Sequence, residues 1–341
     1  MTVVGCATTR ALPLAITMGD PAGIGTETVL EAWRRRALGG PAFFLIDEPG
    51  RVAELARDVT VVAIAEPGEA SDLFERALPV LPLTSGVHGR PSVPDSRDAP
   101  AIVESIERAV AMALAGEASA IVTCPIHKGN LYAAGFAFPG HTELLGHLTG
   151  VERPVMMLAA GSLRVVPVTI HEPLRRVSGL LTEALIVETA VVVDRALRER
   201  FGIARPRLVL AGLNPHAGEG GALGREEIEV VAPAVRTLRG RGIDASGPFP
   251  ADSMFHAAAR RGFDAALCMY HDQAMLPIKT LAFDEAVNVT LGLPLVRTSP
   301  DHGTAFDIAG RGIARAHSMI AAIGLAARLA GQGSELELDA A

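Results

Sequence analysis

The chain has 341 residues, of which 49% are hydrophobic and 20% are charged, which is enough to bury one large core or two ordinary ones. Only 4% of the residues are aromatic and the formal net charge is −7, which argues against a protein that stacks nucleic-acid bases or neutralises phosphates. The mean hydropathy is +0.31, but no uncharged apolar stretch reaches the roughly 20 residues that a membrane-spanning helix needs.

Short apolar runs alternate with helical patterns along the chain. In chain order, we expect strands at residues 12–18, 42–46, 59–65, 78–83, 119–124, 155–160, 163–170, 207–213, 265–269 and 288–298. We expect helices at about 26–36, at 100–115, at 179–200, from 225 onward and within 304–329, and a polar, Pro-rich connection at 84–99. Strands that are apolar at every position and alternate with helices predict an α/β fold with a mostly parallel sheet.

The N-terminus and the cysteines indicate a cytoplasmic protein. The first residues, MTVVGCATTR, lack the basic segment and the long apolar run of a secretory signal. The cysteines Cys6, Cys124 and Cys268 are odd in number and widely separated, which is typical of reduced thiols. No pair of cysteines has the spacing of a zinc finger, so a bound metal would need histidine and carboxylate ligands.

Three histidines follow apolar runs directly. His171, His216 and His271 each stand just beyond a predicted strand. Because sites in such sheets form at the carboxyl ends of strands, these imidazoles are expected to converge. Three neutral imidazoles suit a divalent ion that keeps positions open for a substrate. The alternative is that each histidine makes an ordinary hydrogen bond within its own loop, and the repeated placement favours the metal site.

Two further groups of residues point to an anionic ligand. Residues 19–25, GDPAGIG, form a Gly-rich turn between a strand and a helix, where backbone N–H groups can bind an anion; a simple tight turn is an equally good interpretation. Lys279, Asn288 and Arg297 lie close together in the sequence and are suited to a phosphate or carboxylate, the alternative being surface charge. Asp252 is interpreted either as a catalytic residue or as the N-cap of the next helix.

Six ordered segments make the chain recognisable: ITMGDPAGIGTE, HKGNLYAAGFAFPGHTE, LNPHAGEGGALGREE, GPFPADSMF, MYHDQAMLPIK and VNVTLGLPLVRTSPDHGTAFDIAGRG. Together they resemble the 4-hydroxythreonine-4-phosphate dehydrogenase family of pyridoxal phosphate biosynthesis, over residues from about 12 to 330. The ending DHGTAFDIAGRG also resembles the cofactor loop of isopropylmalate and isocitrate dehydrogenases.

The resemblance implies an architecture. It implies a two-domain α/β/α subunit like that of the isocitrate and isopropylmalate dehydrogenases, which forms a homodimer across the active site. We expect one domain from residues 1–123 with 299–341, which carries the cofactor loop, and a second from residues 124–298, which carries the metal histidines and the dimer interface.

The resemblance also implies roles for particular residues. It assigns one divalent metal ion (zinc, magnesium or cobalt) to His171, His216 and His271, in a site built from both subunits, and the substrate to His141, Thr142, Lys279, Asn288 and Arg297. Contacts to NAD or NADP fall on His302, Gly303, Thr304, Asp307 and Ala309. Lys128 is expected to face the site, and Asp252, Asp272 or a metal-bound water is expected to accept a proton.

The implied reaction is a metal-dependent, NAD(P)-linked oxidation of 4-phosphooxy-L-threonine at C3, followed by decarboxylation to 3-amino-2-oxopropyl phosphate. Two alternatives stay open. One is a paralogous dehydrogenase of 4-phospho-threonate or of an aromatic cis-dihydrodiol acid, and the other is a non-enzymatic sensor that binds a metal or a phosphate.

The chain departs from the family pattern at two positions. Thr26 stands where we expect proline, and Cys124 stands where we expect glycine. Thr26 is expected to cap the first helix, and Cys124 is expected to make the protein sensitive to thiol reagents.

Overall fold

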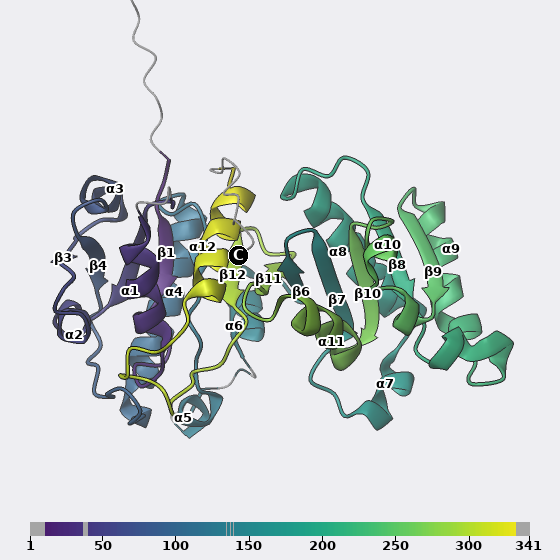
Figure 1. The fold of residues 1–341 in the computed structure, drawn as a ribbon, viewed down its shortest axis with the longest axis horizontal. Helices are drawn as coiled ribbons and strands as arrows, with labels where there is room; N and C mark the ends of the chain where they lie inside the picture. Colours follow the sequence, from purple (N-terminus) through teal and green to yellow (C-terminus); the bar gives the residue numbers. More distant parts are fainter. Residues whose placement is uncertain (1–10, 37–39, 134, 137, 139, 332–341) are drawn as a thin grey trace, which may run out of the picture. The chain divides into compact units, whose positions relative to one another are not determined.

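The structure is a computed structural model that describes residues 11–36, 40–133, 135, 136, 138 and 140–331. Two compact units are present (Figure 1). Unit 1 consists of Met1–Phe136, Gly303–Ala316 and Ala326–Ala341, and unit 2 consists of Ala137–His302 and His317–Leu325. The domain borders expected after residues 123 and 298 stay a prediction, and Cys6 lies outside the described residues. Within the described part of the chain, no helix is long and apolar enough to cross a membrane.

The strands of unit 1 form a parallel sheet in the order β3-β4-β2-β1-β5. Its strands are β1 (Leu14–Thr17), β2 (Phe43–Asp47), β3 (Val61–Ala63), β4 (Leu78–Pro82) and β5 (Ile121–Val122). Its helices are α1 (Gly25–Arg34), α2 (Pro49–Leu55), α3 (Ala70–Leu73), α4 (Ala99–Ala115) and α5 (Lys128–Ala133). Every residue of β1 and β2 is buried, as their continuous apolar sequences predict.

The strands of unit 2 follow the order β12-β11-β6-β7-β10-β8-β9. They are β6 (Val155–Ala160), β7 (Leu163–Thr169), β8 (Arg207–Ala211), β9 (Asp244–Phe249), β10 (Ala265–Tyr270), β11 (Val287–Leu291) and β12 (Arg297–Pro300). Strands β7, β10, β8 and β9 run parallel, whereas β6 and β11 pair with their neighbours in antiparallel fashion. The predicted α/β fold with a mostly parallel sheet is therefore confirmed.

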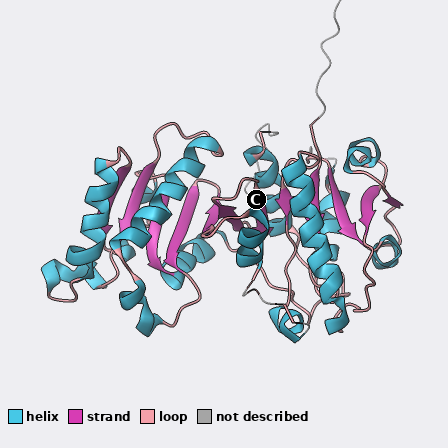
Figure 2. Cartoon of the chain, turned by 180° about the vertical axis from the view of Figure 1, so that it is seen from behind, coloured by secondary structure: helices cyan, strands magenta, loops and turns pink. Residues whose placement is uncertain are grey.

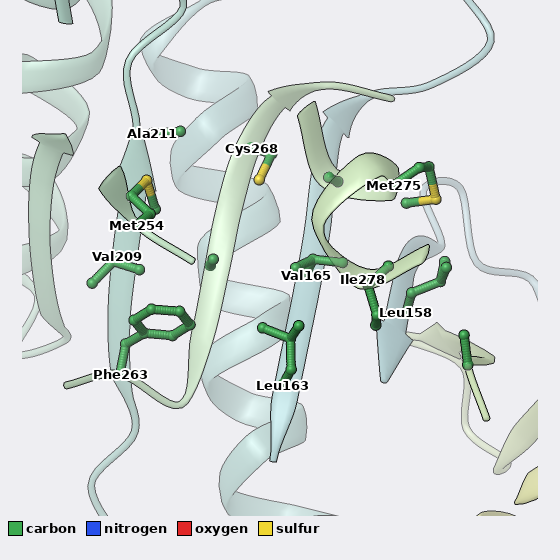
Figure 3. Packing of buried hydrophobic residues seen from close by; sticks show 13 residues of the cluster. Leu158, Leu163, Val165, Val209, Ala211, Met254, Phe263, Cys268, Met275 and Ile278 are labelled. Carbon is green, nitrogen blue, oxygen red and sulfur yellow. The ribbon is translucent and has the colours of Figure 1, made fainter. Parts of the chain in front are cut away.

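The helices of unit 2 pack on both faces of its strands (Figures 1 and 2). They are α6 (His141–Thr149), α7 (Leu174–Leu180), α8 (Glu183–Glu199), α9 (Ala232–Gly240), α10 (Ala257–Arg260) and α11 (His271–Ala282), and α12 (His317–Leu329) begins here too. Helix α11 covers a cluster of buried side chains on β6, β7, β8 and β10, to which it contributes Ala274, Met275 and Ile278 (Figure 3). This packing fixes the N-terminus of α11 at the carboxyl end of β10.

Three predicted elements are wrong in detail. The strand expected at 288–298 is a hairpin of two antiparallel strands, because Gly292 takes a φ of 85° and Pro294 has no N–H for the ladder. The helix expected at 179–200 begins only at Glu183, where the hydroxyl of Thr182 accepts a hydrogen bond from the N–H of Leu185 (3.1 Å). Residues 304–316 are not helical, because Ala305, Gly310 and Gly312 take left-handed φ angles.

Candidate active site

The three predicted metal histidines follow three adjacent parallel strands of unit 2. Strand β10 lies between β7 and β8. His171 comes two residues after β7, His271 comes directly after β10, and His216 comes five residues after β8. Parallel strands end at the same edge of a sheet, so all three histidines belong to the same edge, as the sequence predicts.

His171 and His271 lie side by side at this edge. Thr169 and Tyr270 are partners in the β7–β10 register, and the two imidazole rings that follow have centroids 5.9 Å apart. The Nδ1 atom of His271 is 2.7 Å from Oδ1 of Asp272, so the carboxylate orients the ring. His171 has a φ of 54°, an unusual conformation for a residue other than glycine that often marks a functional site.

The donor atoms of this pair are of the kind that metal sites use. Imidazole nitrogens are good ligands for zinc and cobalt, and the carboxylate beside His271 is the usual second partner of a metal-binding histidine. Among the described residues, however, no group of three or more His, Cys, Asp or Glu side chains is arranged to hold a metal ion. The chemistry of the pair His171 and His271 suits a divalent ion, but two imidazoles alone do not make up the predicted three-histidine site.

His216 lies in a left-handed turn at Pro215–Gly221. Five consecutive residues, 216–220, have positive φ angles between 43° and 76°. Glu227 fixes the base of this turn, because its Oε1 accepts the N–H of Asn214 at 2.7 Å and its Oε2 accepts the side-chain amide of Asn214 at 3.1 Å. Glu227 is only 3% exposed. Glu227 was not predicted from the sequence, because a glutamate in the segment REEIEV looks like an ordinary helix-surface residue.

Asp252 lies in a short 3-10 turn, Ala251–Ser253, and is exposed. Its predicted alternative role as the N-cap of the next helix is wrong, because that helix, α10, is capped by His256, whose side chain accepts the N–H of Ala259. Asp252 therefore stays a candidate for the chemistry, and His256 has a structural role.

Lys279 of α11 reaches the residue that follows β12. Its Nζ is 2.5 Å from Oδ2 of Asp301 and donates a hydrogen bond to the carbonyl oxygen of Asp301 (2.8 Å). Burial raises the pKa of Asp301, and the nearby ammonium group of Lys279 opposes that shift. Asp301 was not among the predicted site residues, although it directly precedes the predicted cofactor residue His302.

Arg297 and Asn288 lie on the β11–β12 hairpin. Arg297 is 3% exposed, and its Nη1 donates a hydrogen bond to the hydroxyl of Thr290 (2.8 Å). Burial lowers the pKa of Arg297 to about 10. The side-chain oxygen of Asn288 is buried and has no hydrogen-bond partner within the described residues. A buried cation near an unsatisfied amide oxygen is consistent with a polar ligand at this hairpin.

His141 and Thr142 open helix α6 and are half-buried. Gly140, which precedes the helix, has no side chain to occupy the space above the first turn.

The predicted cofactor residues from Gly303 onward lie in unit 1, where they contact the GDPAGIG turn. The N–H of Ile24 donates to the carbonyl oxygen of Thr304 (3.0 Å), and a Cβ on Gly23 would lie only 2.8 Å from that oxygen. A carboxylate oxygen of Glu27 accepts the N–H of Gly310. Gly303 has open space where a side chain would be, Asp307 is exposed and Ala309 is buried. His302 is half-buried and falls at the end of a unit 2 segment.

Asp20 is a third residue that was not assigned from the sequence. It is 2% exposed, its Oδ1 accepts the N–H of Ala22 (3.0 Å), and its Oδ2 has no hydrogen-bond partner among the described residues. Burial raises its pKa. The signal for it was its place directly after the first strand.

Lys128 is exposed at the start of α5, next to His127. The ring of His127 packs edge-on against Phe306, with centroids 5.2 Å apart. Helix α5 therefore lies beside the 303–310 loop within unit 1.

The two departures from the family pattern have structural roles that the sequence did not predict. Cys124 is fully buried under the GDPAGIG turn, where burial raises its pKa far above the ordinary value, so the expected sensitivity to thiol reagents is wrong. Thr26 does not cap α1, because the N-cap position belongs to Ile24. Instead its hydroxyl bonds to Asp47 (3.2 Å) and accepts from Arg51 (3.2 Å).

Known proteins resemble the chain along most of its length. Residues 42–326 match the family described as pyridoxal phosphate biosynthetic protein PdxA. The 4-hydroxythreonine-4-phosphate dehydrogenase of Caulobacter vibrioides is 55% identical over 327 residues, which cover 93% of this chain and 97% of that protein.

Solved structures of dehydrogenases have a similar fold. The crystal structure of 4-hydroxythreonine-4-phosphate dehydrogenase from Klebsiella pneumoniae superposes with a TM-score of 0.85 at 39% identity and covers 94% of this chain and 100% of that one. A terephthalate 1,2-cis-dihydrodiol dehydrogenase from Burkholderia xenovorans superposes less well, with a TM-score of 0.63 at 27% identity, over 94% of this chain and 99% of that one. The chain therefore belongs to the pyridoxal phosphate biosynthetic protein PdxA family.

Proposed function

We propose that the chain is a 4-hydroxythreonine-4-phosphate dehydrogenase. It oxidises the C3 hydroxyl of 4-phosphooxy-L-threonine with NAD or NADP, and the resulting β-keto acid loses CO₂ to give 3-amino-2-oxopropyl phosphate. The observation that carries this proposal is the pair His171 and His271, whose rings lie 5.9 Å apart at the ends of two paired strands. The 55% identity with a protein of that name supports the same substrate.

The metal site that we propose uses His171, His216 and His271, with a zinc, magnesium or cobalt ion. Because the described residues do not gather three such ligands, we propose that a homodimer completes the site, so that the three histidines around one ion come from both subunits. The free, buried thiols of Cys124 and Cys268 support a cytoplasmic location for this enzyme.

When bound, a divalent ion supplies Lewis acidity to an alcohol oxygen, and the dinucleotide supplies the two-electron oxidant. The chain's own residues bind and orient the substrate. Lys279 and Arg297 provide positive charge for its anionic ends, and the unsatisfied oxygen of Asn288 accepts a hydrogen bond. His141 and Thr142 are proposed to assist from the first turn of α6.

The proton of the C3 hydroxyl needs an acceptor. Asp252 is exposed, and its carboxylate oxygens are open to a hydroxyl group of a bound substrate, which suits this role. Asp272 is the second candidate, although its hydrogen bond to His271 gives it an orienting role as well. Lys128, which is exposed on α5, is proposed to face the site and is not one of the proton acceptors.

The 303–310 loop is the proposed dinucleotide site. The open space at Gly303 lets a ligand approach the backbone closely, and the exposed carboxylate of Asp307 is suited to ribose hydroxyl groups. Thr304 and Ala309 contribute the backbone that shapes the loop, and His302 flanks it.

A substrate comparison tests the proposal. Purified protein is assayed for NADH or NADPH formation with 4-phosphooxy-L-threonine, 4-phospho-threonate and an aromatic cis-dihydrodiol acid, each with zinc, magnesium or cobalt. The proposal predicts a kcat/KM at least about tenfold higher for 4-phosphooxy-L-threonine, which is about 1.4 kcal/mol of discrimination. A preference for the cis-dihydrodiol acid, the substrate class named for the Burkholderia xenovorans structure, would replace it with the second candidate function.

A further inference from the structure

The Pro-rich connection at 84–99, to which the sequence analysis assigned no function, is anchored at two places. The carboxylate of Glu104 on α4 accepts the N–H groups of Thr84 and Ser85, each at 2.8 Å. The carboxylate of Asp98 accepts the N–H groups of His88 (2.6 Å) and Gly89 (2.9 Å). The segment between these anchors is therefore held in a defined path across unit 1.

Residues 90–93 form a tight turn within this connection. Arg90 and Val93 exchange two backbone hydrogen bonds, of 3.2 and 2.8 Å. Pro91 and Ser92 are the central residues, and Ser92 has a φ of 67°. Proline followed by a left-handed residue is the pattern of a type II turn, in which the second central position favours glycine. An L-residue there costs about 1 kcal/mol, so serine is a poor choice for the turn alone.

The polar groups of Ser92 reach two other segments of unit 1. Its N–H donates to the carbonyl oxygen of Ala22 in the GDPAGIG turn (2.9 Å). Its hydroxyl is shared between the carbonyl oxygens of Phe306 (2.6 Å) and Ala309 (3.0 Å). Pro91 adds a close contact, since a Cβ on Gly310 would lie 2.7 Å from its ring. One residue of the connection thus links the Gly-rich turn to the 303–310 loop.

We propose that Ser92 is a positioning residue for dinucleotide binding, which fixes the 303–310 loop against the GDPAGIG turn through its hydroxyl and its N–H. This inference rests on the proposed function, because that function places the dinucleotide at this loop. Ser92 holds two carbonyl groups of a non-helical segment that also contains the left-handed Ala305. Without the hydroxyl, the loop samples more conformations, and a ligand must order it on binding.

Two substitutions separate this role from the conformation of the turn. Ser92→Ala removes the hydroxyl and keeps the cost of the left-handed φ, whereas Ser92→Gly removes the hydroxyl and relieves that cost. Ser96→Ala is the matched control, because Ser96 lies in the same connection and is exposed. The dissociation constants of NAD and NADP are measured by titration calorimetry on the full chain. Thermal unfolding and the hydrogen exchange of the 303–310 amides are measured on the same proteins without ligand.

The proposal predicts that both Ser92 variants bind the dinucleotide about three- to tenfold more weakly than the wild type, the effect expected for one or two lost hydrogen bonds. Their 303–310 amides exchange faster, Ser92→Gly unfolds at a temperature equal to or above that of Ser92→Ala, and Ser96→Ala behaves as the wild type.

Wild-type affinity in both Ser92 variants overturns the proposal. So does weakened binding in Ser92→Ala alone, because that result assigns the effect to the turn conformation. If the wild-type protein binds neither NAD nor NADP, the cofactor assignment of the proposed function fails as well, which distinguishes the two failures.

Discussion

The carboxylate of Asp301 lies 2.5 Å from the ammonium group of Lys279, and the backbone carbonyl of Asp301 accepts a hydrogen bond from the same nitrogen at 2.8 Å. Two elements are connected by this pair, since Lys279 belongs to α11 and Asp301 follows β12. The lysine that we propose as an anchor for the substrate is therefore held in place by a neighbouring aspartate, with its charge partly compensated.

Replacing Lys279 with methionine is expected to affect both binding and stability. The KM for 4-phosphooxy-L-threonine rises at least about tenfold, because a charge-assisted contact is lost. The free energy of unfolding at pH 8 falls by about 1–3 kcal/mol, because Asp301 keeps a buried charge without its ion-pair partner. Steady-state kinetics and urea unfolding measure the two effects.

The control is the double variant Lys279→Met/Asp301→Asn. It recovers stability, since no buried charge is left, but it keeps the high KM. Burial already raises the pKa of Asp301, so in Lys279→Met this carboxylate becomes protonated more readily as the pH falls, and the buried charge disappears. The loss of unfolding free energy in Lys279→Met is therefore expected to be smaller at pH 5 than at pH 8. A double variant that recovers the KM would show that Lys279 does not contact the substrate.

Arg297 is expected to contribute to substrate binding and to contribute little to the stability of the fold. It is buried with its pKa lowered to about 10, so the fold carries the cost of a desolvated cation. Arg297→Met keeps the side-chain volume and is expected to change the melting temperature by only a few degrees while it raises the substrate KM. Arg297→Ala raises the KM as well and also leaves a cavity. An unchanged KM in both variants, measured by NAD(P)H formation, removes the proposed anion contact.

Asp272 is expected to tune the metal affinity through His271. Its Oδ1 lies 2.7 Å from Nδ1 of His271, and such carboxylate partners typically contribute 10- to 100-fold to metal affinity, so Asp272→Asn is expected to weaken metal binding by about that factor. Titration calorimetry of the chelator-treated protein with zinc or cobalt measures it, with the exposed Asp58→Asn as a remote control. Equal affinities for the two variants would contradict the orienting role.

Glu104 gives a prediction for the pH dependence of stability. Although burial opposes the shift, the N–H groups of Thr84 and Ser85 lower the pKa of Glu104 to about 2. A lowered pKa in the folded state means that the ionised carboxylate stabilises the protein above its unfolded pKa, and that this contribution is lost as the pH falls through 2. Glu104→Gln is expected to cost at most about 3 kcal/mol at pH 7 and almost nothing near pH 2. Denaturant unfolding of the wild type and of Glu104→Gln, measured from pH 7 down to about pH 2, checks this prediction. A difference in unfolding free energy between the two proteins that does not change with pH would contradict the lowered pKa of Glu104.

The sequence predicted the strands of this fold well because burial on both faces requires continuous apolar runs, as in Leu14–Thr17 and Ala265–Tyr270. It also predicted the edge at which His171 and His271 meet, since both follow such runs directly. The errors occurred where backbone conformation overrides composition. The apolar segment 288–298 turns back on itself at Gly292, and Ala305, Gly310 and Gly312 prevent a helix after residue 303.

The residues that sequence reasoning missed act through contacts far apart in the chain. Glu227 holds the His216 turn through Asn214, and Ser92 reaches Phe306 and Ala309 across more than 200 positions. Nothing in the local sequence marks either residue, because a glutamate in a helix and a serine beside proline are common. Only the three-dimensional structure shows the contacts that these two residues make.

The most direct test of the account is the initial rate of NAD(P)H formation from 4-phosphooxy-L-threonine by the chelator-treated protein, before and after a divalent metal is added back. We predict that the wild-type protein is inactive without metal and recovers its activity with zinc, magnesium or cobalt. We also predict that His216→Ala, which keeps the fold, stays inactive with every metal. Undiminished turnover in metal-free buffer, or by His216→Ala, would contradict the three-histidine site on which the proposed function depends.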